Sequence, residues 1–422
     1  MADKSIQLNV IGRILVIVIA IFCGLAAYFP IRWGLGHTIA QYTDSKEVAE
    51  YSTELAPSDS QTYSTLATLS EKSFLADDLQ KAIEQSEKAG SLSPNDYRLW
   101  LNLGKMRERS GDAQGAEKAL RKALELAPNY SAVHWSLGNS LLRNGNTDEA
   151  FVEIRKAVEN DSTYANPAVQ TAWQTFDGDV AQISQKIGDS IPIKAGLVAF
   201  LAGQKKFDEA YAFWKLVPDD KKNTLYKVQG EAFINSLLAA KKFREAFAVQ
   251  SQIASEADNK YTVGNIFNGD FEKEVKTANA SVFDWQISEA EQPLISLDGG
   301  QKHGGNRSLV FVFNSKTGQE FRTVQQLVVV ESGKSYKLEM FYRSDLDTPA
   351  TVKWEVVDIN DSKVLATTDV PINKSPAWST LSATFTTSPT TQAVIIRLAK
   401  APCKQTLCPI TGKLWFDDFS LK

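Results

Sequence analysis

The sequence predicts a multidomain chain, α then β, with an N-terminal transmembrane helix, an α-solenoid of helix pairs, and a C-terminal antiparallel β-sandwich. Three observations lead to this prediction. Residues 14–31 form an apolar run without a charged side chain. A pattern of apolar and small residues then recurs every 34 residues. After residue 261 the helical periodicity gives way to alternating, strand-like segments.

The composition is that of a globular protein with more than one folded part. The length of 422 residues exceeds an ordinary domain of roughly 150 residues, so two or three folded parts are expected. Hydrophobic residues make up 43% of the chain and charged residues 23%. The formal net charge of -4 leaves no basic surplus to neutralise phosphates, so we expect no nucleic-acid partner.

The apolar run at residues 14–31 is long enough for a membrane-spanning helix. With Trp33 counted as an interfacial residue, it approaches the thickness of a hydrocarbon core, roughly 30 Å. A cleaved signal peptide is the competing interpretation, but the run is longer than a typical signal core and no A-x-A site closes it. Phe22 before Cys23 also does not fit a lipobox.

Flanking charges predict the orientation of this anchor. Lys4 and Arg13 precede the run, whereas only Arg32 follows it closely, which places the N-terminus in the cytoplasm. We therefore expect residues 1–34 to form a cytoplasmic tip and a single-pass anchor in a bacterial inner membrane. The bulk of the chain would then be periplasmic.

The chain has three cysteines, and two of them lie close together. Cys23 is inside the apolar run, whereas Cys403 and Cys408 share a segment near the C-terminus. No histidine or third cysteine stands nearby at metal-ligand spacing, which disfavours a zinc site. A small-loop disulfide between Cys403 and Cys408 in an oxidising compartment is the prediction, and two free thiols are the alternative.

A repeat of 34 residues organises the middle of the chain. Leu69, Leu103 and Leu137 occupy equivalent positions. The same interval relates small, turn and closing residues: Ala82, Ala116 and Ala150; Ala89, Ala123 and Ala157; Gly104 and Gly138; Gly111 and Gly145; Pro94 and Pro128.

These residue types fit a helix–turn–helix unit that must stack on its neighbours. Gly104 and Ala116 allow two helices to approach closely, Gly111 with Asp112 supplies a turn, and Pro128 cannot continue a helix. This pattern resembles the tetratricopeptide-repeat (TPR) family. The resemblance implies an α-solenoid that binds proteins, and a single unit of it buries too little apolar surface to stand alone.

The resemblance extends beyond the central units. Residues 47–57 look like the closing helix of a degenerate first unit, and two diverged units are expected near residues 191–224 and 227–258. These last two carry Phe-Asp-Glu-Ala at 207–210 and Phe-Arg-Glu-Ala at 243–246. We therefore assign residues 35–260 to the solenoid.

The resemblance also places a candidate partner site on the concave face of the solenoid. The first helices of two units would present there the residues Lys105, Arg109, Trp135, Asn139 and Arg143. A tryptophan flanked by arginine and asparagine suits a partner peptide. The alternative is that Trp135 packs between helices and that the charges only face water. The Lys and Asn arrangement with which some TPR proteins clamp a C-terminal carboxylate is not reproduced.

Residues 261–422 read as an all-β domain. Alternating segments at 308–313, 336–342, 351–357 and 393–398 are separated by clusters of Gly, Asn, Asp, Ser and Pro, which is typical of a β-sandwich. The domain opens with Asn-Gly-Asp-Phe-Glu at 268–272 and closes with Trp-Phe-Asp-Asp at 415–418.

In that order, these two motifs resemble the galactose-binding-like jelly rolls that serve as carbohydrate-binding modules. The resemblance implies a jelly roll that opens on an N-G-x-F-E strand, and a structural calcium held by Glu272 and Asp417. The alternative is that these acids cap strand ends. Glycan binding would need aromatic and polar side chains, for which we name Tyr342, Arg343 and Trp354.

No motif for catalysis is recognised. His37, His134 and His303 fall in separate segments, and Asp417 and Asp418 would point to opposite faces of one strand. We therefore expect a non-enzymatic, periplasmic scaffold that needs no cofactor beyond the implied calcium. It would bind a protein partner and a glycan in envelope or exopolysaccharide assembly. The alternative is a purely protein-binding assembly factor.

Overall fold

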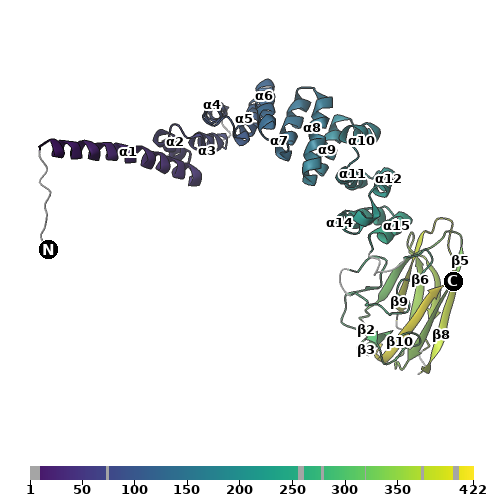
Figure 1. Ribbon diagram of the computed structural model, residues 1–422. Coiled ribbons are helices and arrows are strands. Elements are labelled where there is room, and N and C mark those ends of the chain that lie inside the picture. Colours follow the sequence, from purple (N-terminus) through teal and green to yellow (C-terminus); the bar gives the residue numbers. More distant parts are fainter. Residues whose placement is uncertain are drawn as a thin grey trace, which may run out of the picture. The chain divides into compact units, whose positions relative to one another are not determined.

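The computed structural model describes residues 10–72, 76–254, 261–276, 280–318, 320–371, 375–402 and 408–422. Helices come first and two antiparallel sheets follow (Figure 1), which confirms the predicted fold class. The chain divides into two compact units, Met1–Phe200 and Leu201–Lys422. The last helices therefore belong to the same unit as the sandwich, whereas a division at residue 260 was expected.

The helices have the following bounds: α1 (Val10–Tyr42), α2 (Lys46–Leu55), α3 (Ser60–Glu71), α4 (Ala76–Leu92), α5 (Tyr97–Ser110), α6 (Ala113–Leu126), α7 (Ser131–Arg143), α8 (Thr147–Asn160), the 3₁₀ helix η1 (Ser162–Tyr164), α9 (Ala165–Thr175), α10 (Val180–Ile187), α11 (Ile191–Gly203), α12 (Phe207–Lys215), α13 (Asp219–Lys222), α14 (Lys227–Ala239) and α15 (Phe243–Ile253).

Helix α1 is long and apolar enough to cross a membrane, and its most apolar part is not buried by other residues. It continues past the expected boundary at residue 34 and ends at Tyr42. Gly36 and Ala40 of this extension are buried. The boundary between the apolar segment and the solenoid thus falls inside one helix, because the last turns of α1 pack on α2 and α3.

In the first unit the helices pack as successive pairs, α3 with α4, α5 with α6, and α7 with α8. Gly104 of α5 faces Leu120 of α6 so closely that an added Cβ would lie 2.5 Å from Leu120 Cγ. Asp112 caps α6 by accepting from Gly115 N at 2.9 Å. The turn before it uses Gly111 at φ 84°, a conformation that glycine adopts without a steric penalty.

A buried polar cluster joins the two helices of the α7–α8 pair. His134 and Glu153 are both buried, and His134 Nδ1 lies 2.5 Å from Glu153 Oε2. The other ring nitrogen lies 2.8 Å from the Pro128 carbonyl oxygen. Lys156 Nζ donates to Glu153 Oε1 at 2.9 Å. Hydrogen bonds from both ring nitrogens therefore hold His134 within the α7–α8 pair.

In the second unit, helix α15 is held against the sandwich. Arg244 Nη2 donates to the Val330 carbonyl oxygen at 3.2 Å and to Ser332 Oγ at 3.1 Å. The Phe247 ring lies edge-on to Phe283, with centroids 5.2 Å apart. These polar and aromatic contacts bind the last helix pair to the β domain, which explains the position of the unit boundary.

The strands have the following bounds: β1 (Gln286–Ile287), β2 (Leu294–Asp298), β3 (Ser308–Ser315), β4 (Val324–Val329), β5 (Ser335–Ser344), β6 (Val352–Asp358), β7 (Val364–Asp369), β8 (Ser375–Thr386), β9 (Ala393–Lys400) and β10 (Ile410–Leu421).

These strands form two five-stranded sheets, ordered β1-β4-β9-β6-β7 and β2-β3-β10-β5-β8, with antiparallel pairing throughout. Aromatic rings fill the core between them, including Trp285, Trp354 and Phe416. The opening motif at 268–272 forms turns, although a strand was expected. It still lies against β10, because Phe419 N donates to the Gly269 carbonyl oxygen at 2.9 Å.

Replacing Gly104 with alanine tests the close approach within a helix pair. The new Cβ would collide with Leu120, so we expect the free energy of unfolding to fall by about 1–3 kcal/mol. Gly203→Ala is the matched control, because a Cβ there meets nothing within 4 Å and alanine favours a helix. Urea unfolding of the full chain in detergent, followed by circular dichroism at 222 nm, measures both. Equal midpoints for the two variants would contradict this packing.

Candidate functional site

The five residues predicted to bind a partner line one groove in the first unit. Lys105 and Arg109 stand one turn apart on α5, and Trp135, Asn139 and Arg143 follow at the same spacing on α7. Residues four apart share one helix face, so each helix turns its set to the same side. The remaining residues of the lining are Glu108, Ala132, Ser136 and Tyr164, and the groove has a volume of about 450 Å³.

An aromatic pair forms one wall of this groove. The Trp135 ring is half-buried and lies 5.3 Å from the Tyr164 ring, centroid to centroid, at an interplanar angle of 36°. Asn139 Nδ2 donates to the Trp135 carbonyl oxygen at 2.8 Å. Trp135 therefore both packs within the solenoid and keeps part of its indole open to the groove.

The charges of the groove are only partly compensated. Arg109 Nη1 lies 2.6 Å from Glu71 Oε1, whereas Arg143 Nη1 is 3.9 Å from Glu108 Oε1. That oxygen is buried and has no hydrogen-bond partner. Burial raises the pKa of Glu108, and the positive charges of Arg143 and Lys105 oppose that rise. The groove thus holds three cations around one poorly solvated carboxyl group.

Of the three residues predicted to bind glycan, only Arg343 reaches the surface. Arg343 Nη1 donates to Gln301 Oε1 at 2.5 Å, and its guanidinium lies 5.7 Å from the Trp415 ring centroid. Trp415 stands opposite Arg343 on the neighbouring strand, and its Nε1 donates to Asp298 Oδ2 at 2.8 Å. A cation, an aromatic ring and an acid therefore meet on the outer face of the β2-β3-β10-β5-β8 sheet, where Trp415 is 6% exposed and thus covered by its neighbours.

More rings lie beside this cluster. The His303 ring stacks on Phe341, with centroids 3.6 Å apart, and lies edge-on to Trp378 at 5.9 Å. His303 Nδ1 is 2.6 Å from Asp418 Oδ2. Phe341 is two residues before Arg343 on β5, so strand alternation puts both on the outer face.

Tyr342 and Trp354 were wrongly assigned to glycan binding. Tyr342 is 5% exposed and Trp354 is 1% exposed, so neither ring can stack on a sugar. Tyr342 alternates with Phe341 and Arg343 and therefore points into the sandwich. Trp354 packs edge-on against Phe416 at 5.2 Å in the core.

Several residues of this face were missed at the sequence level. Trp415 belongs to the closing motif, but the motif does not tell which face of the strand the ring occupies. Its register opposite Arg343 decides that. Gln301 and His303 lie between β2 and β3 and carry no sequence signal for this position.

The predicted calcium ligands are both held by N–H donors. Glu272 Oε1 accepts from Asn306 N at 2.5 Å and from Arg307 N at 2.9 Å, and these bonds lower the pKa of Glu272. Asp417 is fully buried and accepts from His303 N at 2.9 Å. Within the described ranges no group of three or more His, Cys, Asp or Glu side chains could hold a metal ion. Both carboxylates thus already accept hydrogen bonds from backbone N–H groups, and calcium binding by Glu272 and Asp417 stays a prediction.

The cysteines are described in part. Cys408 is 4% exposed and disulfide-bonded, and Cys23 is free and exposed on α1. Cys403, the predicted partner of Cys408, lies outside the described residues.

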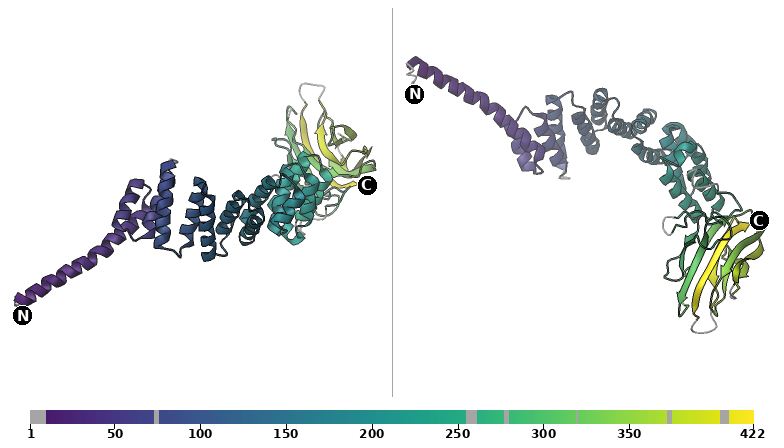
Figure 2. Two further views of the ribbon diagram at one scale, coloured as in Figure 1. Left: turned by 90° about the horizontal axis from the view of Figure 1, so that it is seen from above. Right: turned by 60° about the horizontal axis from the view of Figure 1, so that its bottom comes forward.

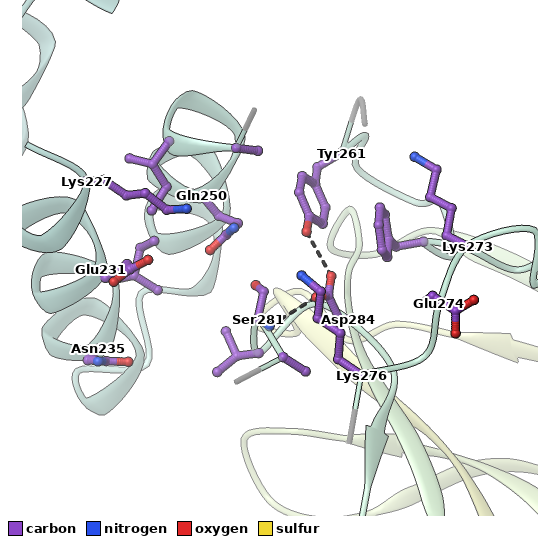
Figure 3. Close-up of a pocket in the computed structure, with 16 residues that line it drawn as sticks. Lys227, Glu231, Asn235, Gln250, Tyr261, Lys273, Glu274, Lys276, Ser281 and Asp284 are labelled. Carbon is purple, nitrogen blue, oxygen red and sulfur yellow. Dashed lines mark hydrogen bonds between the residues drawn. The ribbon is translucent and has the colours of Figure 1, made fainter. Parts of the chain in front are cut away.

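A larger cavity of about 860 Å³ lies between the last helix pair and the sandwich. Figure 3 shows Lys227, Glu231 and Gln250 of the helices facing Tyr261 and Asp284 of the β domain. Tyr261 Oη donates to Asp284 Oδ1 at 2.8 Å. Residues 255–260 and 277–279 adjoin the lining in sequence and are outside the described residues, so we assign no ligand to this cavity.

Two sequence families match the two parts of the chain. The profile of a family described as a tetratricopeptide repeat matches residues 76–131 and 101–165. The profile of a carbohydrate binding domain matches residues 263–405. The chain contains tetratricopeptide repeats and a carbohydrate-binding-module-like β-sandwich. The groove between α5 and α7 is thus a TPR groove, and the Arg343 cluster lies on the module.

Several solved structures are similar to parts of the chain. MamA from Desulfovibrio magneticus RS-1 is 16% identical, with 37% of this chain and 93% of that chain covered and a TM-score of 0.32. YrrB, titled a TPR protein with an unusual peptide-binding site, is 16% identical, with 50% and 92% covered and a TM-score of 0.27. A structure titled "CBM4 structure and function" is 19% identical, with 37% and 98% covered and a TM-score of 0.28. No curated protein matches the chain.

The raised pKa of Glu108 in the TPR groove predicts a pH effect on stability. The folded chain keeps this proton to a higher pH than the unfolded chain, in which the pKa has its ordinary value of 4.5. Protonation of Glu108 therefore stabilises the folded chain at low pH. This stabilisation is lost as the pH rises from 4.5 through the raised pKa that Glu108 has in the folded chain. Glu108→Gln removes it, so the fall in Tm from pH 5 to pH 8 should shrink by about 2 °C.

Thermal unfolding of the full chain in detergent measures this difference. Glu159→Gln is the control, because Glu159 is an exposed acid at the end of α8. The same pH dependence in wild type and in Glu108→Gln would contradict a raised pKa of the buried Glu108 carboxyl group.

Proposed function

We propose that this chain is a membrane-anchored, periplasmic scaffold that captures a protein segment in the TPR groove and contacts glycan with the outer face of its β-sandwich. Its setting would be envelope or exopolysaccharide assembly. The observation that carries the proposal is the convergence of Lys105, Arg109, Trp135, Asn139 and Arg143 on one groove.

The groove suits an extended, acidic protein segment with an apolar anchor. Trp135 and Tyr164 offer an aromatic wall for that anchor. Lys105 and Arg143 offer cations that the nearby Glu108 neutralises only in part. Charge complementarity then favours aspartate and glutamate in the partner.

The Arg343 cluster supports the glycan half of the proposal. Trp378 supplies a half-buried ring beside it, and Arg343, Gln301 and Asp298 supply groups that can bond hydroxyls. One observation favours a purely protein-binding factor. His303 already covers a face of Phe341 at 3.6 Å, which removes one ring face from stacking on a sugar.

The location rests on α1 and on Cys408. Helix α1 can span a membrane, and positive charges at Lys4 and Arg13 favour a cytoplasmic N-terminus. A disulfide at Cys408 is typical of an oxidising compartment such as the periplasm. We assign no reaction to the chain, since His37 lies on α1, His134 on α7 and His303 between β2 and β3.

A peptide library tests the TPR groove. The full chain in lipid nanodiscs is presented with random displayed peptides, and we expect enrichment of peptides that combine acidic with apolar residues. Arg143→Glu should weaken binding of the enriched peptides by tenfold or more, which is about 1.4 kcal/mol. Lys118→Glu is the control, because Lys118 is exposed on α6, away from this groove. Enriched peptides without acidic residues, or equal losses in both variants, would contradict this site.

A glycan array of bacterial envelope polysaccharides tests the β-sandwich. We expect the full chain to bind at least one polysaccharide, and Trp378→Ala or Arg343→Ala to weaken that binding by about tenfold, since each removes a contact worth roughly 1.4 kcal/mol. Val364→Ala is the control, because Val364 is exposed on β7 of the other sheet. Failure to bind any polysaccharide would leave the purely protein-binding factor as the function.

A further inference from the structure

The solenoid has no linker to the membrane anchor. Helix α1 runs without interruption from Val10 to Tyr42, and its last turns pack on α2 and α3. Figures 1 and 2 show the free part of α1 extending away from α2 and α3, while its C-terminal part lies beside them.

Contacts at successive levels fix this extension to its neighbours. Arg32 Nη2 donates to the Glu54 carbonyl oxygen at 2.6 Å. One turn farther, Gly36 lies against α2, where an added Cβ would be 2.8 Å from the Ala56 Cβ. At the end of the helix the Ala40 carbonyl oxygen accepts from Thr65 Oγ1 at 3.0 Å.

A further bond holds the turn between α2 and α3, residues 54–59, which we call the corner. His37 Nδ1 lies 2.8 Å from Asp59 Oδ2, and Asp59 caps α3 by accepting from Gln61 N at 3.1 Å. The corner therefore cannot swing away from α1 without breaking several bonds at once.

These contacts set the height of the corner above the membrane. Arg32 directly follows the apolar run at residues 14–31, and it is bonded to Glu54. Glu54 is thus level with the end of the apolar run, and Ala56 and Asp59, which lie against Gly36 and His37, are about one turn of α1 beyond it. An apolar helix places that end at the boundary of the hydrocarbon core.

We propose that the corner formed by residues 54–59 rests on the lipid headgroup layer, so that the solenoid starts on the membrane surface. This inference rests on the proposed anchoring by α1. The exposed side chains here suit an interface, because Trp33 and Tyr51 carry amphipathic rings of the kind found at headgroup depth. The charges at this level are mixed, with Arg32 on α1 bonded to the backbone of Glu54 on α2, so the contact needs no anionic lipid.

Spin labels in lipid bilayers test the depth of the corner. Ser58→Cys and Asp44→Cys are made in a Cys23→Ser background, with the Cys408 disulfide left intact, and the full chain is placed in phosphatidylcholine vesicles. Ser58 is exposed at the corner, and Asp44 is exposed at the opposite end of α2. Collision rates with oxygen and with a water-soluble nickel complex report the depth of each label.

We expect the Ser58 label at headgroup depth and the Asp44 label in water, separated by the length of α2, about 15 Å. Equal accessibility of both labels to the nickel complex would overturn the inference. Anionic vesicles should give the same depth for Ser58.

Substitutions at two neighbouring glycines of α1 test whether the packing of α1 on α2 holds the corner: one disturbs this packing and the other is the control. Gly36→Leu would collide with Ala56 and with the Ser52 carbonyl oxygen, whereas a Cβ at Gly34 meets nothing within 4 Å. We expect Gly36→Leu to release the Ser58 label into water and Gly34→Leu to leave it in place. A Ser58 label that stays at headgroup depth in Gly36→Leu would show that the packing on α1 does not hold the corner.

Carbonate extraction separates this inference from the anchoring on which it rests. If the wild-type chain leaves the membrane at alkaline pH, the anchoring itself fails. If it remains integral and the Ser58 label is in water, only the docked corner fails.

Discussion

In three helix pairs, a large side chain of one helix packs directly on the backbone of a glycine in the other helix, and this contact sets the distance between the two helices. Gly104 receives Leu120 in this way, Gly138 receives Ile154, and Gly230 of the last pair receives Ile253. Each of these side chains is in van der Waals contact with the glycine backbone, so the glycine Cα has no room for a methyl group. Between the α5–α6 and α7–α8 pairs, side chains such as Leu120 and Leu137 share one hydrophobic core.

Much of this architecture could be predicted from residue spacing. The recurrence of Leu103, Gly104 and Gly111 in the next unit specifies a helix, a close approach and a turn, and all three are local properties. The continuation of α1 to Tyr42 could not be predicted in the same way. Residues 32–42 are less apolar than the segment before them, so the hydropathy pattern ends near residue 31, whereas the helix continues to Tyr42 and packs on α2 and α3.

The sequence predicted which residues share the groove of the solenoid, but it did not predict which residues share the outer face of the β-sandwich. Lys105, Arg109, Trp135, Asn139 and Arg143 were found because a helix fixes which residues share a face, and the repeat fixes which helices are neighbours. On the β-sandwich, Tyr342 and Trp354 were misplaced because alternation along a strand gives two faces without saying which is the core. Loop residues such as His303 reach their place through long-range packing that no local pattern encodes.

The docking of α15 on the sandwich has a consequence for how such a module can be moved between proteins. Arg244 satisfies the Val330 carbonyl oxygen, and Phe247 covers Phe283. A β-sandwich cut out at residue 262 would expose that ring to water and lose that donor. The transferable part is therefore the helix pair together with the sheets, and a recombination junction upstream of α14 would preserve its native surface.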